Sequence, residues 1–94
     1  MGGGVAIVRL TIGQRELLEI LDEAATNRDY RPEVLCAPDV VALVRHDGTY
    51  LPTTQPPYDL AAVLTEGLVV TVGADLFQPT EAGRLALTAR PSKR

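Results

Sequence analysis

The chain has 94 residues, of which 46% are hydrophobic and 22% are charged, and its formal net charge is −3. This length fits one compact domain over residues 1–94, with a flexible N-terminus at residues 1–4 and a frayed basic tail at residues 89–94. Cys36 is the only cysteine, which excludes a disulfide-built secreted scaffold. The first apolar run stops at Arg9, too early for a signal peptide or a membrane span. We therefore expect a cytoplasmic protein with no membrane partner.

The N-terminal part predicts a short strand followed by an amphipathic helix. Val5–Leu10 favours the strand, and apolar residues at helical spacing predict the helix over Ile12–Ala25. Thr11 and Gln14 match a capping box, in which each side chain satisfies a backbone N–H at the helix start. The opposite face of this helix is acidic, with only one arginine among its acids: Glu16, Glu19, Asp22 and Glu23. We expect that face to be exposed.

The next segment, Thr26–Pro38, is rich in Asn, Asp and Pro and predicts a loop with a brief extended piece at Val34–Cys36. Asp39–Thr53 suits either a short helix or a β-hairpin. We favour the hairpin because β-branched residues precede Asp47-Gly48, a pair typical of a two-residue type I′ turn.

The C-terminal half predicts a connector, a helix, a hairpin and a second helix. Pro52–Pro57 is the connector, and a helix of about nine residues then ends at Gly67, which accepts the left-handed conformation of a helix stop. Strands are predicted at Leu68–Val72 and Leu76–Gln78, joined by a turn. Thr80 caps a final helix that runs to about Thr88, and Glu81 places a negative charge at its start.

Leu64–Leu87, with the sequence LTEGLVVTVGADLFQPTEAGRLAL, resembles the C-terminal half of a winged-helix domain, and Leu10–Leu21 resembles its first helix. The resemblance implies a small winged-helix-like α+β domain with about three helices and one or two β-hairpins. The centre departs from the family, whose members have a second helix and a tight turn before the recognition helix. Pro79 also stands where the family usually has Leu or a similar residue.

Charge argues against the DNA binding that this family suggests. No lysine or arginine lies between His46 and Gly83, the interval that holds the would-be recognition helix and wing. Phosphate neutralisation by such cations provides most nucleic-acid affinity. A DNA-binding transcriptional regulator acting as a dimer remains the alternative, and it would grip DNA through a separate basic set: Arg84, Arg90, Lys93 and Arg94.

We instead expect a small regulatory or inhibitory protein-binding module whose partner has a basic surface, since acidic patches steer association with basic proteins. Small acidic inhibitors of phages and mobile elements, such as anti-CRISPR proteins, offer an analogy. A homodimer is compatible with this hypothesis. The candidate partner-binding residues are exposed acids, small helix residues and residue types common at interfaces: Tyr30, Arg31, Tyr50, Tyr58, Asp59, Ala62, Thr65 and Glu66.

Enzymatic chemistry is not expected. Cys36 and His46 are the only thiol and imidazole, and no third residue is apparent that would orient them as a catalytic pair. One Cys and one His do not provide the four ligands of a structural zinc site. The Gly2–Gly4 run lacks the Gly-Lys-Ser/Thr of a phosphate-binding loop. We therefore expect no cofactor and no metal.

Overall fold

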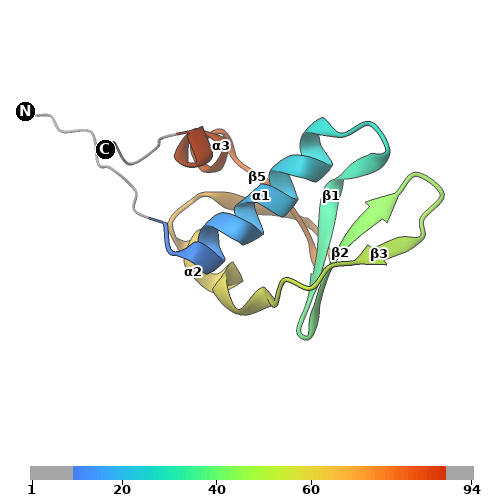
Figure 1. Cartoon of the computed structure of the whole chain (residues 1–94), viewed down its shortest axis with the longest axis horizontal. Helices are drawn as coiled ribbons and strands as arrows, with labels where there is room; N and C mark the ends of the chain where they lie inside the picture. The colour runs from blue at the N-terminus through green and yellow to red at the C-terminus, as the bar shows by residue number, and fades with distance from the viewer. Residues whose placement is uncertain (1–9, 89–94) are drawn as a thin grey trace, which may run out of the picture.

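The structure is a computed structural model that describes residues 10–88. These residues form an α+β fold in which three α-helices accompany a five-stranded antiparallel sheet (Figure 1). The elements in chain order are α1 (Ile12–Thr26), β1 (Tyr30–Ala37), β2 (Val40–Arg45), β3 (Tyr50–Pro52), η1 (Pro57–Asp59), α2 (Leu60–Thr65), β4 (Val69–Gly73), β5 (Leu76–Pro79) and α3 (Glu81–Thr88). The strand order is β3-β2-β1-β5-β4. Three predictions fall on residues that the structure does not describe: the flexibility expected of residues 1–4, the basic tail expected at residues 89–94, and the strand expected at Val5–Leu10, of which only Leu10 is described.

Helix α1 begins as its sequence predicts. The Thr11 hydroxyl accepts a hydrogen bond from the Gln14 backbone N–H, and the Gln14 side-chain oxygen accepts one from the Thr11 N–H, which confirms the capping box. The apolar face of α1 is completely buried at Leu17, Leu18 and Leu21. It packs across the sheet mainly against β1 and β5, so α1 covers one face of the sheet.

The loop predicted over Thr26–Pro38 is wrong for most of its length, because Tyr30–Ala37 forms β1, the central strand of the sheet. The extended piece predicted at Val34–Cys36 lies within β1 and is confirmed. β1 pairs with β2 on one side and with β5, some forty residues along the chain, on the other. Pro32 is tolerated because it lies between Tyr30 and Val34, where the register with β2 shifts. Proline has no N–H for a regular ladder and occurs in strands mainly at such irregularities.

The hairpin predicted at Asp39–Thr53 is confirmed as β2 and β3, but its predicted turn is wrong. The Arg45 N–H donates to the Thr49 carbonyl and the Gly48 N–H to the Arg45 carbonyl, which closes a three-residue loop. Gly48 has φ +90° while Asp47 does not have a positive φ. A type I′ turn requires positive φ at both central residues, so this loop is a type I turn followed by a left-handed glycine.

The C-terminal half follows its predicted order. Gly67, with φ +75°, follows the C-cap of α2 and ends it, and β4 and β5 form the predicted hairpin. Thr80 caps α3 by accepting a hydrogen bond from the Gly83 N–H. It also donates one to the Gly67 carbonyl, so a single hydroxyl joins the start of α3 to the end of α2.

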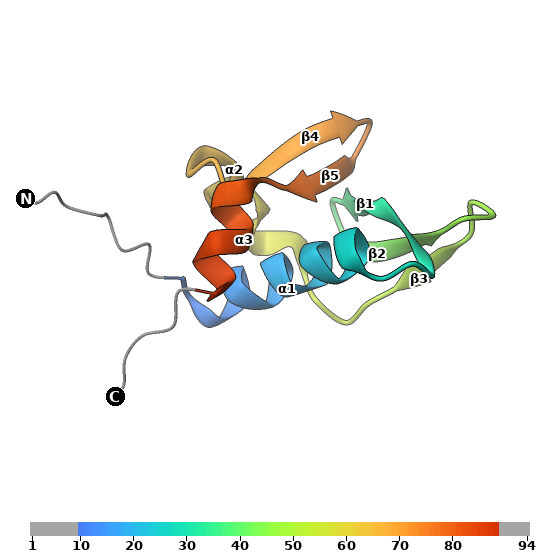
Figure 2. The same cartoon turned by 90° about the horizontal axis from the view of Figure 1, so that it is seen from above.

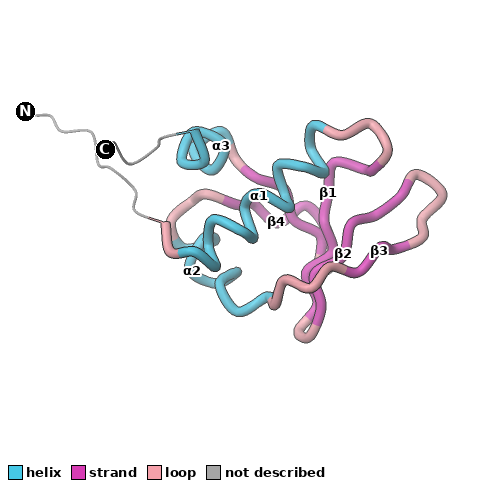
Figure 3. The backbone as a smooth tube through the Cα atoms, in the orientation of Figure 1, coloured by secondary structure: helices cyan, strands magenta, loops and turns pink. Residues whose placement is uncertain are grey.

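One hydrophobic core lies between α1 and the inner face of the sheet. Its members come from all three helices and from β1, β2, β4 and β5, and include Leu17, Val34, Val63, Leu68 and Phe77. Figure 3 distinguishes by colour the helices and strands that contribute to it. Figure 2 shows β4 at the far side of the sheet, with β5 between it and β1. Among the helices of residues 10–88, none is long and apolar enough to cross a membrane.

Candidate functional site

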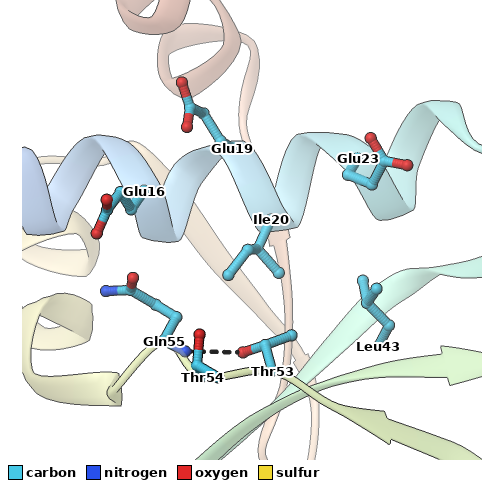
Figure 4. Close-up of a pocket in the computed structure, with 8 residues that line it drawn as sticks. All are labelled: Glu16, Glu19, Ile20, Glu23, Leu43, Thr53, Thr54 and Gln55. Atoms are coloured by element: carbon cyan, nitrogen blue, oxygen red, sulfur yellow. Dashed lines mark hydrogen bonds between the residues drawn. The ribbon is translucent and has the colours of Figure 1, made fainter.

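An open groove of about 360 Å³ lies between α1 and the connector that follows β3. Three glutamates of α1 line one wall, and Thr53, Thr54 and Gln55 line the other. Ile20 points from α1 toward Thr53 and Leu43 and gives the groove an apolar floor (Figure 4). The glutamates of this acidic groove are Glu16, Glu19 and Glu23.

Hydrogen bonds hold the connector wall of the groove in place. Both the backbone N–H and the hydroxyl of Thr53 donate to the Val41 carbonyl, each at 2.8 Å, which extends the edge of the sheet by one residue. The Gln55 N–H donates to the Thr53 hydroxyl at 3.2 Å, the bond drawn in Figure 4. The Gln55 side chain reaches back to the Gly13 carbonyl at the start of α1. The two walls are therefore tied together at one end.

The glutamates of the groove are not neutralised by the described part of the chain. Within residues 10–88 the one salt bridge joins Arg84 to Asp22, at 3.1 Å, and involves none of the three. Glu23 accepts a hydrogen bond from the uncharged Asn27 amide. Glu16 lies on the side of α1 that faces Gln55, whereas the Glu19 carboxylate points away from the connector (Figure 4). The spread of these carboxylates suits an extended cationic segment better than a single ion. Among the described residues, no cluster of three or more His, Cys, Asp or Glu side chains could hold a metal ion.

Five of the predicted partner-binding residues lie on η1, on α2 or at the C-cap of α2, but not all of them face solvent. Tyr58 is 84% exposed, and Thr65 and Glu66 are also exposed. Asp59 and Ala62 are partly buried. The Asp59 carboxylate lies directly against Gly13 in the first turn of α1, where a negative charge complements the helix dipole. Asp59 therefore supports the junction between η1 and α1.

The other three predicted partner-binding residues lie on the β1 to β3 strands. Tyr30 is partly buried against the core, and Tyr50 is 54% exposed on the edge strand β3. Arg31 is exposed and donates to the His46 carbonyl at 2.9 Å. The eight residues thus divide between two separate groups of elements, and none of them lines the acidic groove.

The structure also gathers a basic end that the sequence did not indicate. His46 donates from Nε2 to the Arg28 carbonyl at 2.6 Å, and Arg31 bonds the His46 carbonyl, so the start of β1 and the β2–β3 turn are joined. Tyr30 pairs with Arg45 across the sheet. The members of this basic end are Arg28, Arg31, Arg45 and His46, and all four are exposed. Two exposed acids, Asp29 and Asp47, flank them in the sequence. They are separated by up to 18 positions in the sequence, which is why no local pattern reveals them.

Of the residues predicted for DNA binding, only Arg84 lies in the described part of the chain, and it is bound to Asp22 of α1 while remaining half exposed. Arg90, Lys93 and Arg94 lie outside it.

Cys36 and His46 occupy different environments. Cys36 is buried in β1, and burial, followed by the charge of Asp75, raises the pKa of its thiol to about 11. His46 lies in the exposed β2–β3 turn and is bonded to Arg28. Thiolate chemistry needs a lowered thiol pKa, so the environment of Cys36 is that of a core residue.

Comparisons with protein-family models, with curated proteins and with solved structures find no match to this chain.

Proposed function

We propose that the chain is a cytoplasmic regulatory or inhibitory protein-binding module that binds a basic segment of its partner in the acidic groove. The observation that carries this proposal is the groove wall of Glu16, Glu19 and Glu23, which no described cation neutralises. A lysine or arginine side chain would pair with the Glu16 carboxylate while its methylene stem covers the floor at Ile20 and Leu43. Further basic residues of an extended segment that crosses α1 would pair with Glu19, whose carboxylate points away from the connector, and with Glu23. An inhibitor from a phage or mobile element is one setting in which occupying a partner's basic surface is a sufficient mechanism.

We also propose a winged-helix-like scaffold for this module. It is supported by the order of the α2 stop at Gly67, the β4–β5 hairpin and the Thr80-capped α3. The three strands between α1 and η1 are the main departure from that scaffold.

The proposal is tested by titrating labelled peptides of about twelve residues, one rich in Lys and Arg and one rich in Glu, and following fluorescence anisotropy. We expect binding of the basic peptide only. The triple variant Glu16→Gln, Glu19→Gln, Glu23→Gln should weaken it about tenfold, since each exposed ion pair contributes roughly 0.2–1 kcal/mol. The matched control is Glu33→Gln, Glu66→Gln, Glu81→Gln, which changes the net charge equally but lies outside the groove. Equal losses in both variants would mean that net charge alone governs binding.

The second candidate function is duplex DNA binding, and the basic end is the observation that favours it. A DNA-binding dimer would use Arg28, Arg31 and Arg45 together with Arg84, Arg90, Lys93 and Arg94. Anisotropy titrations with a labelled duplex across a salt series test this candidate. Submicromolar affinity with a steep salt slope, lost when the arginines of the basic end become alanine, would support DNA binding. This DNA-binding result, together with a failure of the basic peptide to bind, would contradict the protein-binding proposal.

A further inference from the structure

The two edges of the sheet differ in what they offer to a further strand. β3 has only three residues. Hydrogen-bonded and non-bonded positions alternate along its ladder with β2, so the backbone groups of Tyr50 and Pro52 point away from β2. Pro52 has no N–H to donate. A short strand that carries proline at its edge is a common protection against pairing with another chain. The β3 edge is therefore closed to a partner strand.

β4 has no such protection along Val69–Gly73, which contains neither proline nor a charged residue. Its outward groups follow from the ladder with β5. The Thr80 N–H donates to the Leu68 carbonyl, so Leu68 and Val70 face β5 and the backbone N–H and C=O of Val69 and Thr71 face away from it. The pairing of Val69 with Pro79 agrees, because a proline fits at a position that donates nothing to the ladder.

No described residue pairs with the outer side of β4. Val70 and Val72 are 45% and 46% exposed, and the nearest acids, Glu66 and Asp75, lie beyond the two ends of the strand. A bulge at Val72 limits the regular part of the edge to Val69–Thr71. This regular part is uncharged and rich in β-branched residues, the composition that favours strand pairing.

We propose that β4 pairs antiparallel with β4 of a second copy of this chain. A two-fold axis at Val70 brings Val69 of each copy opposite Thr71 of the other. The four outward N–H groups of the two copies then donate to the four outward carbonyls. The two Val70 side chains then meet in a non-hydrogen-bonded pair, the closer kind of cross-strand contact. A second copy suits this strand because the pairing about Val70 is self-complementary. The chain as a whole is acidic, but β4 has no charged residue, so two copies can meet along it without like charges in contact.

The resulting dimer joins two five-stranded sheets into one and leaves both acidic grooves accessible, because β4 does not line the groove. This inference is therefore independent of the proposed function. Its failure would leave the peptide titration unaffected.

Sedimentation equilibrium of the full chain tests the dimer directly. We expect the mass to rise with concentration toward twice the 10.1 kDa chain. Val70→Lys, which puts two positive charges at the axis, should weaken dimerisation at least tenfold, while Tyr50→Lys on β3 should leave it unchanged. Thr71→Pro should also weaken it, because it removes an outward N–H that the ladder with β5 does not use. A monomer at every concentration would overturn the proposal.

Cross-linking then tests the register. Val70→Cys and Val72→Cys introduce thiols at nearly equally exposed positions, and with the axis at Val70 only the former faces its own copy. Under oxidised glutathione we expect disulfide dimers from Val70→Cys and few from Val72→Cys, with the buried Cys36 thiol as a common background. Equal yields would contradict this register. The competing occupant of this edge is the chain's own strand predicted at Val5–Leu10. If that strand covers β4, the chain stays monomeric and Thr71→Pro lowers its stability.

Discussion

Gly83 of α3 lies directly against the backbone carbonyl of Leu68, so that a methyl group on Gly83 would overlap the Leu68 oxygen. The same carbonyl accepts a hydrogen bond from the Thr80 N–H. This contact sets how closely α3 approaches the start of the β4–β5 hairpin. It explains a glycine inside a helix, where glycine is otherwise unfavourable.

Gly83→Ala should lower the free energy of unfolding by about 1–3 kcal/mol, the usual cost of overpacking a tight contact. Alanine has the better helix propensity by about 1 kcal/mol, so an uncrowded site would show the opposite sign. Urea denaturation followed by circular dichroism measures the difference. A stabilised Gly83→Ala variant would mean that α3 moves away from Leu68 at little cost.

Thr80→Ala should lower the free energy of unfolding by about 1–2 kcal/mol, because the hydroxyl both caps α3 and bonds the Gly67 carbonyl. Thr80→Ser keeps the hydroxyl and is the matched control. We expect it to retain most of the stability in the same urea experiment. Equal losses in the two variants would assign the effect to the threonine methyl group instead.

Asp47 should titrate below its ordinary pKa of 3.8, because the Thr49 hydroxyl and backbone N–H both donate to its carboxylate. A lowered folded-state pKa means that this stabilisation is present above the ordinary value and is lost as the pH falls through the lowered one. Carboxyl chemical shifts in an NMR titration locate the midpoint. Thr49→Val removes the hydroxyl donor and should move the Asp47 midpoint upward; an unmoved midpoint would exclude this cause.

Cys36 should contribute to a loss of stability in alkali. Its folded-state thiol pKa of about 11 lies above the ordinary 9.0, so the folded chain is favoured below pH 9 and loses this advantage as the pH rises from about 9 to about 11. The tyrosines also titrate in alkali. Comparing the pH dependence of the free energy of unfolding between the wild type and Cys36→Ala separates the contribution of the thiol from theirs. Alkylation by iodoacetamide at pH 8 should be slow in the folded protein and fast in urea. Rapid labelling of the folded protein would contradict the buried, protonated thiol.

The acidic face of α1 was predictable from spacing alone, but the groove was not. Glu16, Glu19 and Glu23 fall on one side of a helix because of its 3.6-residue period. The opposite wall, Thr53–Gln55, lies thirty or more positions further along the chain and is placed by the bonds from Thr53 to Val41. The basic end has the same origin, since hydrogen bonds between distant segments bring Arg28 and His46 together.

The elements whose causes are local could be predicted from the residues alone. The Thr11–Gln14 capping box, the Gly67 stop and the Thr80 cap each depend on residues within a few positions of one another, so their side-chain chemistry is legible before folding. Tertiary pairing makes Tyr30–Ala37 the central strand. β2 follows it directly, but its second ladder partner, β5, comes from some forty residues further along the chain, and the two pairings outweigh the local preference of Pro32 for a loop. The tertiary structure also decided which strands became edges, since strand order depends on those long-range pairings.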